Sequence, residues 1–400
     1  MLVILRNSIF IKHINYYCNF IINLKKKIIR TSTIPASLEV FLKGFLNRLS
    51  EEYEVLAVSS PGERLDIVRE REGVRTIGIP MERHISIFKD FVSLFRLILL
   101  FMKEKPSLVH SMTPKAGLLS MVAAKITGVP VRIHTFTGLI FPTSVGLKRR
   151  VLIFMDKLIC WCATYINPEG RGVANDLKKY HITNKPLHIV ANGNVRGVDM
   201  EWYKRTEQVL KQAIQIRIKD SFTFCFVGRL VRDKGINELS SAFNKLTQEF
   251  PHVRLILLGD YEHELDPLTD ETKDIIQQNS HIISVGRQQD IRPFLAASDA
   301  FVFPSYREGF PNSVLEAGAL GLPAIVTDIN GCNEIIIQGE NGEIIQPRDE
   351  EALYNKMKEW ILEPEKVIYM AEKSRKLVED RFEQKMIWNE LLNTYKELLN

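Results

Sequence analysis

The stretch AFVFPSYREGFPNSVLEAGALGLPAIVT, residues 300–327, decides the fold class of this chain. Its apolar start, residues 300–304, is typical of a buried strand, and residues 313–321 have the composition of a helix. A second short apolar run follows at residues 324–327. Strand, helix and strand in direct succession form a β-α-β unit, whose two strands lie parallel in one sheet.

The same alternation extends along the chain, so we expect an α/β fold with two Rossmann-like, doubly wound parallel sheets. Strands are predicted at 27–31, 54–59, 75–79, 108–111, 132–135, 165–168, 222–227, 254–259, 281–285, 300–304 and 324–327. Helices are predicted at 37–50, 63–72, 86–105, 116–127, 146–163, 235–250, 270–278, 291–298 and 313–321, with a helical connector at 199–219 and a helical region from 350.

Four segments follow from this order of elements. Residues 1–24 form an extension, 25–200 an N-terminal domain and 201–385 a C-terminal domain. Residues 386–400 form a last helix, which we expect to pack back toward the N-terminal domain. Ligands of such sheets bind at the carboxyl ends of the strands, so we expect both domains to face a central cleft.

Composition excludes several classes of protein. With 400 residues, 45% hydrophobic and 25% charged, the chain matches a folded globular protein and not a disordered or fibrous one. Its five cysteines lack zinc-ligand spacing and a disulfide pattern, which fits a reducing cytoplasm. Residues 1–200 carry 29 Lys and Arg against 15 Asp and Glu, whereas residues 201–400 carry 24 against 33. The basic half suits an anionic membrane or a phosphorylated ligand, and no aromatic-basic module favours nucleic acid.

Membrane contact has two candidate segments. No apolar run reaches the roughly 18 residues that span a bilayer. Residues 1–24 are apolar and aromatic, and we interpret them either as a membrane-touching tail or as an unstructured extension. The helix at 86–105 has a dense apolar face, which either packs on the sheet or lies against anionic lipid.

Two glutamates mark the first candidate site. Glu308 lies in the turn after a predicted strand, and Glu316 lies one turn into the next helix, which Asn312 or Ser313 can cap. A carboxylate beside a helix N-terminus can accept hydrogen bonds from a vicinal diol such as a ribose. The alternative is a capped surface helix with two solvated acids.

Two cations mark the second candidate site. Gly228 permits a tight turn after the strand at 222–227, and Arg229 and Lys234 follow it. Such cations could stabilise the charge of a departing diphosphate without a metal, although a solvated basic loop is the alternative. Neither a Walker loop nor a Gly-x-Gly-x-x-Gly dinucleotide fingerprint is present.

Together these residues resemble glycosyltransferase family 4, the retaining nucleotide-sugar transferases of GT-B fold. The match spans about 120 residues, including Gly228-Arg229, Lys234-Gly235, Glu308-Gly-Phe-Pro, Glu316-Ala and Gly331-Cys-Asn-Glu334. The resemblance implies that Arg229 and Lys234 hold the donor diphosphate, that Glu316 binds the ribose, and that Glu308 touches the donor sugar. Glu308, Arg229 and Lys234 would be catalytic. The donor-binding set implied is Gly228, Arg229, Lys234, Gly286, Arg287, Glu308, Gly309, Phe310, Pro311, Asn312, Leu315 and Glu316.

The N-terminal half is similar to a bacterial branch of this family that builds capsule, O-antigen and other lipid-linked glycans. Its segments 110–117 and 133–142 each follow a predicted strand. The acceptor residues implied are His110, Thr113, Lys115, His134 and Thr137. For the two histidines the alternative is strand-end packing, and for Lys115 it is a solvated lysine at a helix start.

Two departures from the family pattern stand out. The turn after the first strand, residues 31–37, is not glycine-rich, and Thr137 stands where many members have a histidine that contacts the donor sugar. No Asp-x-Asp occurs, so we expect no metal or other cofactor in the chemistry. The cluster Glu262-His-Glu264 could bind a cation, but we interpret it as a solvated loop.

We therefore expect a retaining hexosyltransferase that moves an N-acetylhexosamine from a UDP donor, in α linkage, to a saccharide on undecaprenyl diphosphate. It would work in surface polysaccharide synthesis, in the cytoplasm, as a peripheral protein on the inner face of the cytoplasmic membrane. The alternatives are a sugar-nucleotide epimerase of the same architecture and a catalytically silent scaffold that binds nucleotide sugars.

Overall fold

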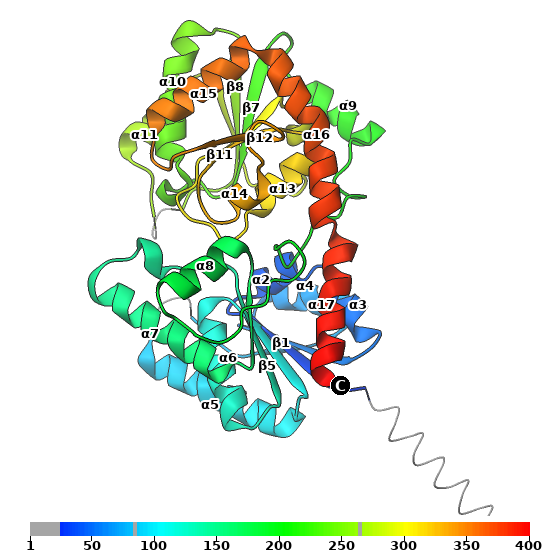
Figure 1. Ribbon diagram of the computed structural model, residues 1–400. Helices are drawn as coiled ribbons and strands as arrows, with labels where there is room; N and C mark the ends of the chain where they lie inside the picture. The colour runs from blue at the N-terminus through cyan, green and yellow to red at the C-terminus, as the bar shows by residue number, and fades with distance from the viewer. Residues whose placement is uncertain (1–24, 83–85, 263–265) are drawn as a thin grey trace, which may run out of the picture. The chain divides into compact units, whose positions relative to one another are not determined.

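Two six-stranded parallel sheets organise the chain in a computed structural model that describes residues 25–82, 86–262 and 266–400 (Figure 1). The first sheet has the strand order β3-β2-β1-β4-β5-β6 and the second the order β12-β11-β10-β7-β8-β9. In each sheet the first strand lies near the middle; the next two strands are added on one side of it, and the last three on the other side. The expected doubly wound α/β fold is therefore confirmed.

The elements have the following bounds. The strands are β1 (Lys27–Thr31), β2 (Glu54–Ser59), β3 (Arg75–Gly78), β4 (Leu108–Met112), β5 (Val131–Phe136), β6 (Tyr165–Pro168), β7 (Phe222–Val227), β8 (Val253–Leu258), β9 (Ile282–Gly286), β10 (Ala300–Phe303), β11 (Ala324–Thr327) and β12 (Gly342–Ile345). The helices are α2 (Pro35–Phe41), α3 (Phe45–Ser50), α4 (Glu63–Glu72), α5 (Ile87–Glu104), α6 (Pro114–Ile126), α7 (Gly146–Cys162), α8 (Arg171–Lys179), α9 (Glu207–Ile216), α10 (Ile236–Glu249), α11 (Asp270–Gln278), α12 (Arg292–Ala296), α13 (Asn312–Ala319), α14 (Cys332–Ile335), α15 (Glu350–Leu362), α16 (Pro364–Phe382) and α17 (Gln384–Leu399), with short 3₁₀ turns η1 (Phe141–Thr143) and η2 (Arg232–Lys234).

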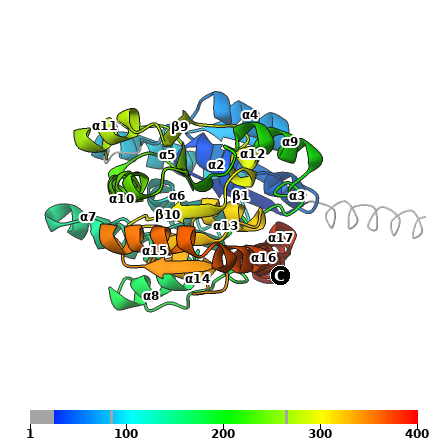
Figure 2. The same cartoon turned by 90° about the horizontal axis from the view of Figure 1, so that it is seen from above.

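Contacts divide the chain into two compact units. Among the described residues, one unit holds those up to His134 together with 161–164 and 398–400, and the other holds those in 135–160 and 165–397. In the second unit α10 lies against α11 and α15, and α13 lies against α16 (Figure 2). The second unit therefore includes the last residues of β5 and all of β6 as well as the whole second sheet.

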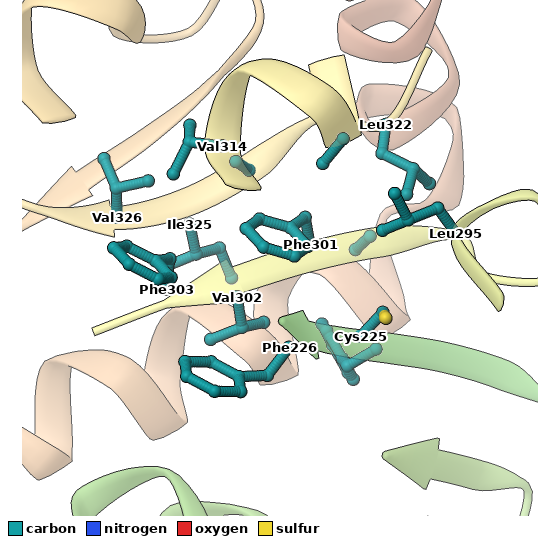
Figure 3. Close-up of a cluster of buried hydrophobic side chains, with 14 of the residues drawn as sticks. Cys225, Phe226, Leu295, Phe301, Val302, Phe303, Val314, Leu322, Ile325 and Val326 are labelled. Carbon is teal, nitrogen blue, oxygen red and sulfur yellow. The ribbon is translucent and has the colours of Figure 1, made fainter. Parts of the chain in front are cut away.

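The core of the second unit forms where the central strands meet α13. Figure 3 shows side chains of β7, β10 and β11 gathered with Val314 of α13 and with Leu322. Phe301, Val302 and Ile325 are fully buried. Strands that are covered on both faces read as continuous apolar runs, which is why the sequence identifies them. This core holds the loops after β7 and β10 in place.

Several local predictions need correction. The single helix expected at 37–50 is two helices, because Gly44 adopts a left-handed φ of 79° between them. The helical region expected from residue 350 is present and consists of three helices, of which α16 begins at Pro364, a residue suited to the first helical position. Neither Asn312 nor Ser313 caps α13, which begins at Asn312 after Pro311 without a side-chain cap. The sequence reading also missed α8 and β12.

Among the described helices, none combines the length and the apolar character that a membrane span requires. The extension 1–24 lies outside the described residues.

Candidate functional site

The candidate site lies where β7 and β10 end, at the switch point of the second sheet. These strands are neighbours, yet the chain builds β8 and β9 on one side of β7 before it returns to β10. Ligands of open α/β sheets bind outside the carboxyl ends of the strands at such a point. The two loops that carry the predicted charges, 228–234 and 304–311, both start there.

A lysine and a glutamate meet between these loops. Lys234 of η2 forms an ion pair with Oε1 of Glu308, and the side chains are 18% and 15% exposed. The hydroxyl of Ser305 donates a hydrogen bond to the same oxygen over 2.8 Å. Gly235 brings the loops together, because its φ is 70° and a Cβ there would lie 2.1 Å from the carbonyl oxygen of Pro304. The structure thus places two of the three predicted catalytic residues in contact.

The turn at Gly309 touches a segment that lies far away in the sequence. A Cβ on Gly309 would lie 2.3 Å from the carbonyl oxygen of Thr137, and one on Gly138 would lie 3.2 Å from the backbone nitrogen of Gly309. Only glycines allow two backbones to approach this closely. Thr137, which stands in place of the usual histidine, is therefore next to the turn that carries Glu308.

Glu316 is held by an arginine that the sequence reading did not single out. It is 7% exposed and lies in α13, as expected. Its Oε1 is 2.8 Å from a terminal guanidinium nitrogen of Arg196. The alternative of a solvated surface acid is therefore wrong for Glu316. Asn312 accepts a hydrogen bond from the side-chain amide of Asn194 over 2.9 Å.

A hollow of about 480 Å³ opens beside the first of these loops. Its lining includes Gly228, Arg229 and Arg287, which are all predicted donor-binding residues, together with Asp260 and Tyr261. The backbone nitrogen of Arg287 donates to the carboxylate of Asp260 over 3.1 Å, which fixes the wall of the hollow. Lys234, Glu308 and Glu316 are not part of the described lining. Some of the predicted donor residues therefore line this hollow, whereas Lys234 and Glu308 form one ion pair, and Glu316 forms another with Arg196, outside its described lining.

The remaining predicted donor residues are mostly buried. Gly286 ends β9, and its carbonyl accepts a hydrogen bond from Gly259 over 3.0 Å. Phe310 is 4% exposed, with its ring 5.4 Å from that of Phe382. Leu315 belongs to the hydrophobic core and is fully buried, so its side chain serves packing. Their donor-binding roles stay predictions.

A second buried glutamate, Glu169, was missed from the sequence. It directly follows β6, is 1% exposed, and its Oε1 has no hydrogen-bond partner in the part of the chain that the structure describes. Burial, together with the charges of Glu308 and Glu334, raises the pKa of Glu169 to about 8. An acid directly after a strand end is the signal that could have identified it.

Glu334 was noticed in the sequence without a role. Its two carboxylate oxygens accept the backbone N–H groups of Arg171 and Gly172 over 2.6 and 2.9 Å, at the start of α8. A carboxylate at a helix N-terminus is stabilised by the free N–H groups and the helix dipole. Glu334 thus fixes α8 within the second unit.

The predicted acceptor residues of the first unit are buried and paired. His134 accepts or donates a hydrogen bond with Ser111 over 2.8 Å, and burial lowers the pKa of His134 to about 3. Burial, then the charges of Arg30 and His134, lowers the pKa of His110 well below its usual value. Both histidines therefore have the environment of the packing alternative, and an acceptor contact stays a prediction.

Lys115 and Thr113 are also held in place. The ammonium group of Lys115 bonds both carboxylate oxygens of Asp90 at 2.7 and 2.8 Å, and its side chain is 6% exposed. The alternative of a solvated lysine is therefore wrong. Thr113 has a φ of 68°, unusual for a β-branched residue, and its hydroxyl lies 2.8 Å from that of Thr33.

In the described ranges, no three or more His, Cys, Asp or Glu side chains group so that they could hold a metal ion. Two members of the Glu262-His-Glu264 cluster lie outside the described residues. Independence from metal stays a prediction.

Two family models match this chain. Residues 210–377 match the glycosyl transferases group 1 model, and residues 44–193 match the glycosyl transferase 4-like domain. The chain is 33% identical over 380 residues to the capsular polysaccharide biosynthesis glycosyltransferase CapM of Staphylococcus aureus, covering 94% of this chain and 98% of that relative.

Two further comparisons are informative. The chain is 32% identical over 298 residues to the UDP-Gal:alpha-D-GlcNAc-diphosphoundecaprenol alpha-1,3-galactosyltransferase of Escherichia coli, covering 71% of this chain and 74% of that relative. The crystal structure of Anabaena Alr3699/HepE in complex with UDP has a TM-score of 0.78 at 18% identity, covering 94% of this chain and 100% of that one. That likeness concerns the fold.

Proposed function

Because this chain belongs to the group 1 glycosyltransferases with a glycosyltransferase 4-like domain, we propose that it moves an N-acetylhexosamine from a UDP donor to a saccharide on undecaprenyl diphosphate. The product would serve the synthesis of a surface polysaccharide such as a capsule. The Escherichia coli relative, named for a UDP-sugar donor and a diphosphoundecaprenol acceptor, supports both substrate classes.

One observation carries the proposal: the Lys234–Glu308 pair and its Ser305 hydrogen bond stand at the switch point of the second sheet. Glu308 and Ser305 hold the lysine charge in place before any substrate arrives. Preorganised charge of this kind stabilises a transition state more effectively than charge that must first reorient.

In the proposed reaction, the bond between the anomeric carbon and the diphosphate oxygen breaks. Arg229 and Lys234 stabilise the negative charge that develops on the diphosphate, without a metal. The acceptor hydroxyl oxygen bonds to the anomeric carbon on the face that the diphosphate leaves, and its proton passes to a diphosphate oxygen. The product therefore keeps the α configuration.

The test is transfer by the purified chain. A panel of UDP-sugars is incubated with synthetic undecaprenyl-diphosphate saccharides, and the lipid product is identified by mass spectrometry and its linkage by NMR. We expect one UDP-sugar to give an α-linked product, with Glu308→Gln as the inactive control. Conversion of the UDP-sugar without an acceptor would instead indicate an epimerase, and binding without either reaction would indicate a scaffold.

We also propose peripheral contact with the inner face of the cytoplasmic membrane, through α5. One face of this helix packs inward through Leu97, Leu100 and Phe101. The other face exposes Phe88, Phe91, Phe95, Leu99 and Met102, between 50% and 81%. An exposed apolar stripe on a helix in a basic half of the chain suits the interface of an anionic bilayer.

Flotation with vesicles tests the α5 contact. The chain should float with vesicles that contain phosphatidylglycerol, and the double variant Phe88→Glu, Phe91→Glu should not. Equal flotation of both proteins would remove α5 from the membrane contact.

A further inference from the structure

The segment 194–197, here called the linker brace, holds two residues of α13. The amide of Asn194 donates to Asn312, the first residue of α13, over 2.9 Å. Arg196 pairs with Glu316, one turn further along, at 2.8 Å. Both partners belong to the set that the proposed function assigns to the donor, so the brace contacts the donor site from outside the second sheet.

The backbone of the brace is itself fixed. Asn194 is fully buried with a left-handed φ of 57°, and its side-chain oxygen accepts the N–H groups of Arg196 and Gly197 over 3.2 and 2.7 Å. The next residue, Val198, exchanges backbone hydrogen bonds with Phe382 and Gln384 over 2.8 and 2.9 Å. An arginine on such a rigid turn has few alternative directions, which suits it to orient a partner.

The pair is largely withdrawn from water. The side chains of Arg196 and Glu316 are 15% and 10% exposed. Burial opposes the charge of Arg196, yet Glu316 and Tyr203 raise its pKa above the usual value. Burial, followed by the charge of Glu316, raises the pKa of Tyr203. A carboxylate beside a guanidinium accepts hydrogen bonds and donates none, which is what two ribose hydroxyls require of a partner.

We propose that Arg196 is a positioning residue for nucleotide recognition, which orients the Glu316 carboxylate to accept hydrogen bonds from the ribose hydroxyls of a nucleoside diphosphate. The proposal rests on the proposed function, in which Glu316 binds that ribose. In this proposal the linker brace determines the preference for ribose over 2′-deoxyribose, and it acts through Glu316 and not by contacting the nucleotide.

The test is binding of UDP and of 2′-deoxy-UDP to the full chain by calorimetry. Removing a hydrogen bond to a charged group weakens binding on the order of tenfold or more, so the wild type should prefer UDP by at least about that factor. Arg196→Gln should weaken the binding of UDP on the order of tenfold, and it should weaken the binding of 2′-deoxy-UDP, which keeps only the 3′ hydroxyl, by a smaller factor. The double variant Arg196→Gln, Glu316→Gln should bind UDP no more weakly than Glu316→Gln alone.

Arg205→Gln is the matched control. Arg205 donates to the carbonyl of Leu320 over 2.9 Å, directly after the other end of α13, so this variant loosens the helix without touching Glu316. It should keep the wild-type preference for UDP. In steady-state kinetics, Arg196→Gln should raise the donor KM with little change in kcat. A merely structural role would instead lower kcat and raise the donor KM together.

The outcomes separate the two proposals. A wild-type chain that binds neither nucleotide overturns the proposed function. A wild-type chain that prefers UDP, with the same preference in Arg196→Gln, overturns the role of Arg196. Should Arg196→Gln fail to fold, Arg196→Lys keeps the charge but not the planar fork, and an unchanged preference there overturns the role equally.

Discussion

Replacing Glu169 by glutamine should make the protein less sensitive to alkali. Glutamine has the shape of the protonated acid but cannot lose a proton. In the folded chain the pKa of Glu169 is raised to about 8 from its usual 4.5, first by burial and then by Glu308 and Glu334. The folded state therefore keeps a proton that the unfolded state releases.

The size of the effect follows from that difference. The stabilising contribution of the proton is fully present below the unfolded pKa and is lost as pH rises through the folded pKa. Between pH 4.5 and pH 8 the free energy of unfolding falls by about 1.4 kcal/mol per pH unit, or about 5 kcal/mol in all. By neutral pH about 3 kcal/mol of this has been lost.

The assay is denaturant unfolding of the wild type and Glu169→Gln from about pH 5 to about pH 9, with fluorescence and circular dichroism as probes. We expect the free energy of unfolding of the variant to rise relative to that of the wild type through this interval, and the difference between the two to level off above pH 8. Glu365, exposed in the first turn of α16, provides the control, and Glu365→Gln should show a similar difference at each pH. A Glu169→Gln difference that does not vary with pH would refute the reasoning.

Three further predictions concern catalysis. Arg229→Ala and Lys234→Ala should each lower turnover on the order of 10²-fold, because each removes a contact to the departing diphosphate; normal turnover at saturating donor in both variants would contradict this. Transfer should persist in EDTA, whereas loss that Mg²⁺ or Mn²⁺ restores would show that a metal shares the role of the two cations. Glu316→Gln should mainly raise the donor KM, and Glu308→Gln should mainly lower kcat. If steady-state kinetics showed only a change of KM for Glu308→Gln, this assignment of different roles to the two glutamates would be wrong.

The sequence could predict those site residues whose place in the fold follows from the order of strands and helices. Lys234 and Glu308 each follow a strand, and parallel strands end at the same edge of a sheet, so their meeting follows from the order of elements. Arg196 escaped prediction because its partner, Glu316, lies 120 residues away along the chain and no local pattern marks the ion pair. Glu169 does follow a strand, but its burial and the effect of the Glu308 charge on its pKa depend on segments far away in the sequence.

Buried polar side chains were the other difficulty. A histidine or lysine at a strand end looks the same in sequence whether it meets a ligand or a neighbour. The structure pairs Lys115 with Asp90 and His134 with Ser111, which lie 25 and 23 residues away along the chain. Periodicity indicates which face of an element is apolar, but it does not indicate which polar group will find a partner inside.

The set of residues that make up the second unit has a consequence for the design of chimeric enzymes. Residues 135–160 belong with 165–397, although a sequence-based division would cut near residue 200. A hybrid joined at that point would take the two members of several contacts from different parents, among them Arg196–Glu316, Asn194–Asn312 and Gly138–Gly309. A chimera with a new donor preference should therefore fold and work more often when the loops that follow the strands of both sheets are taken from the same parent.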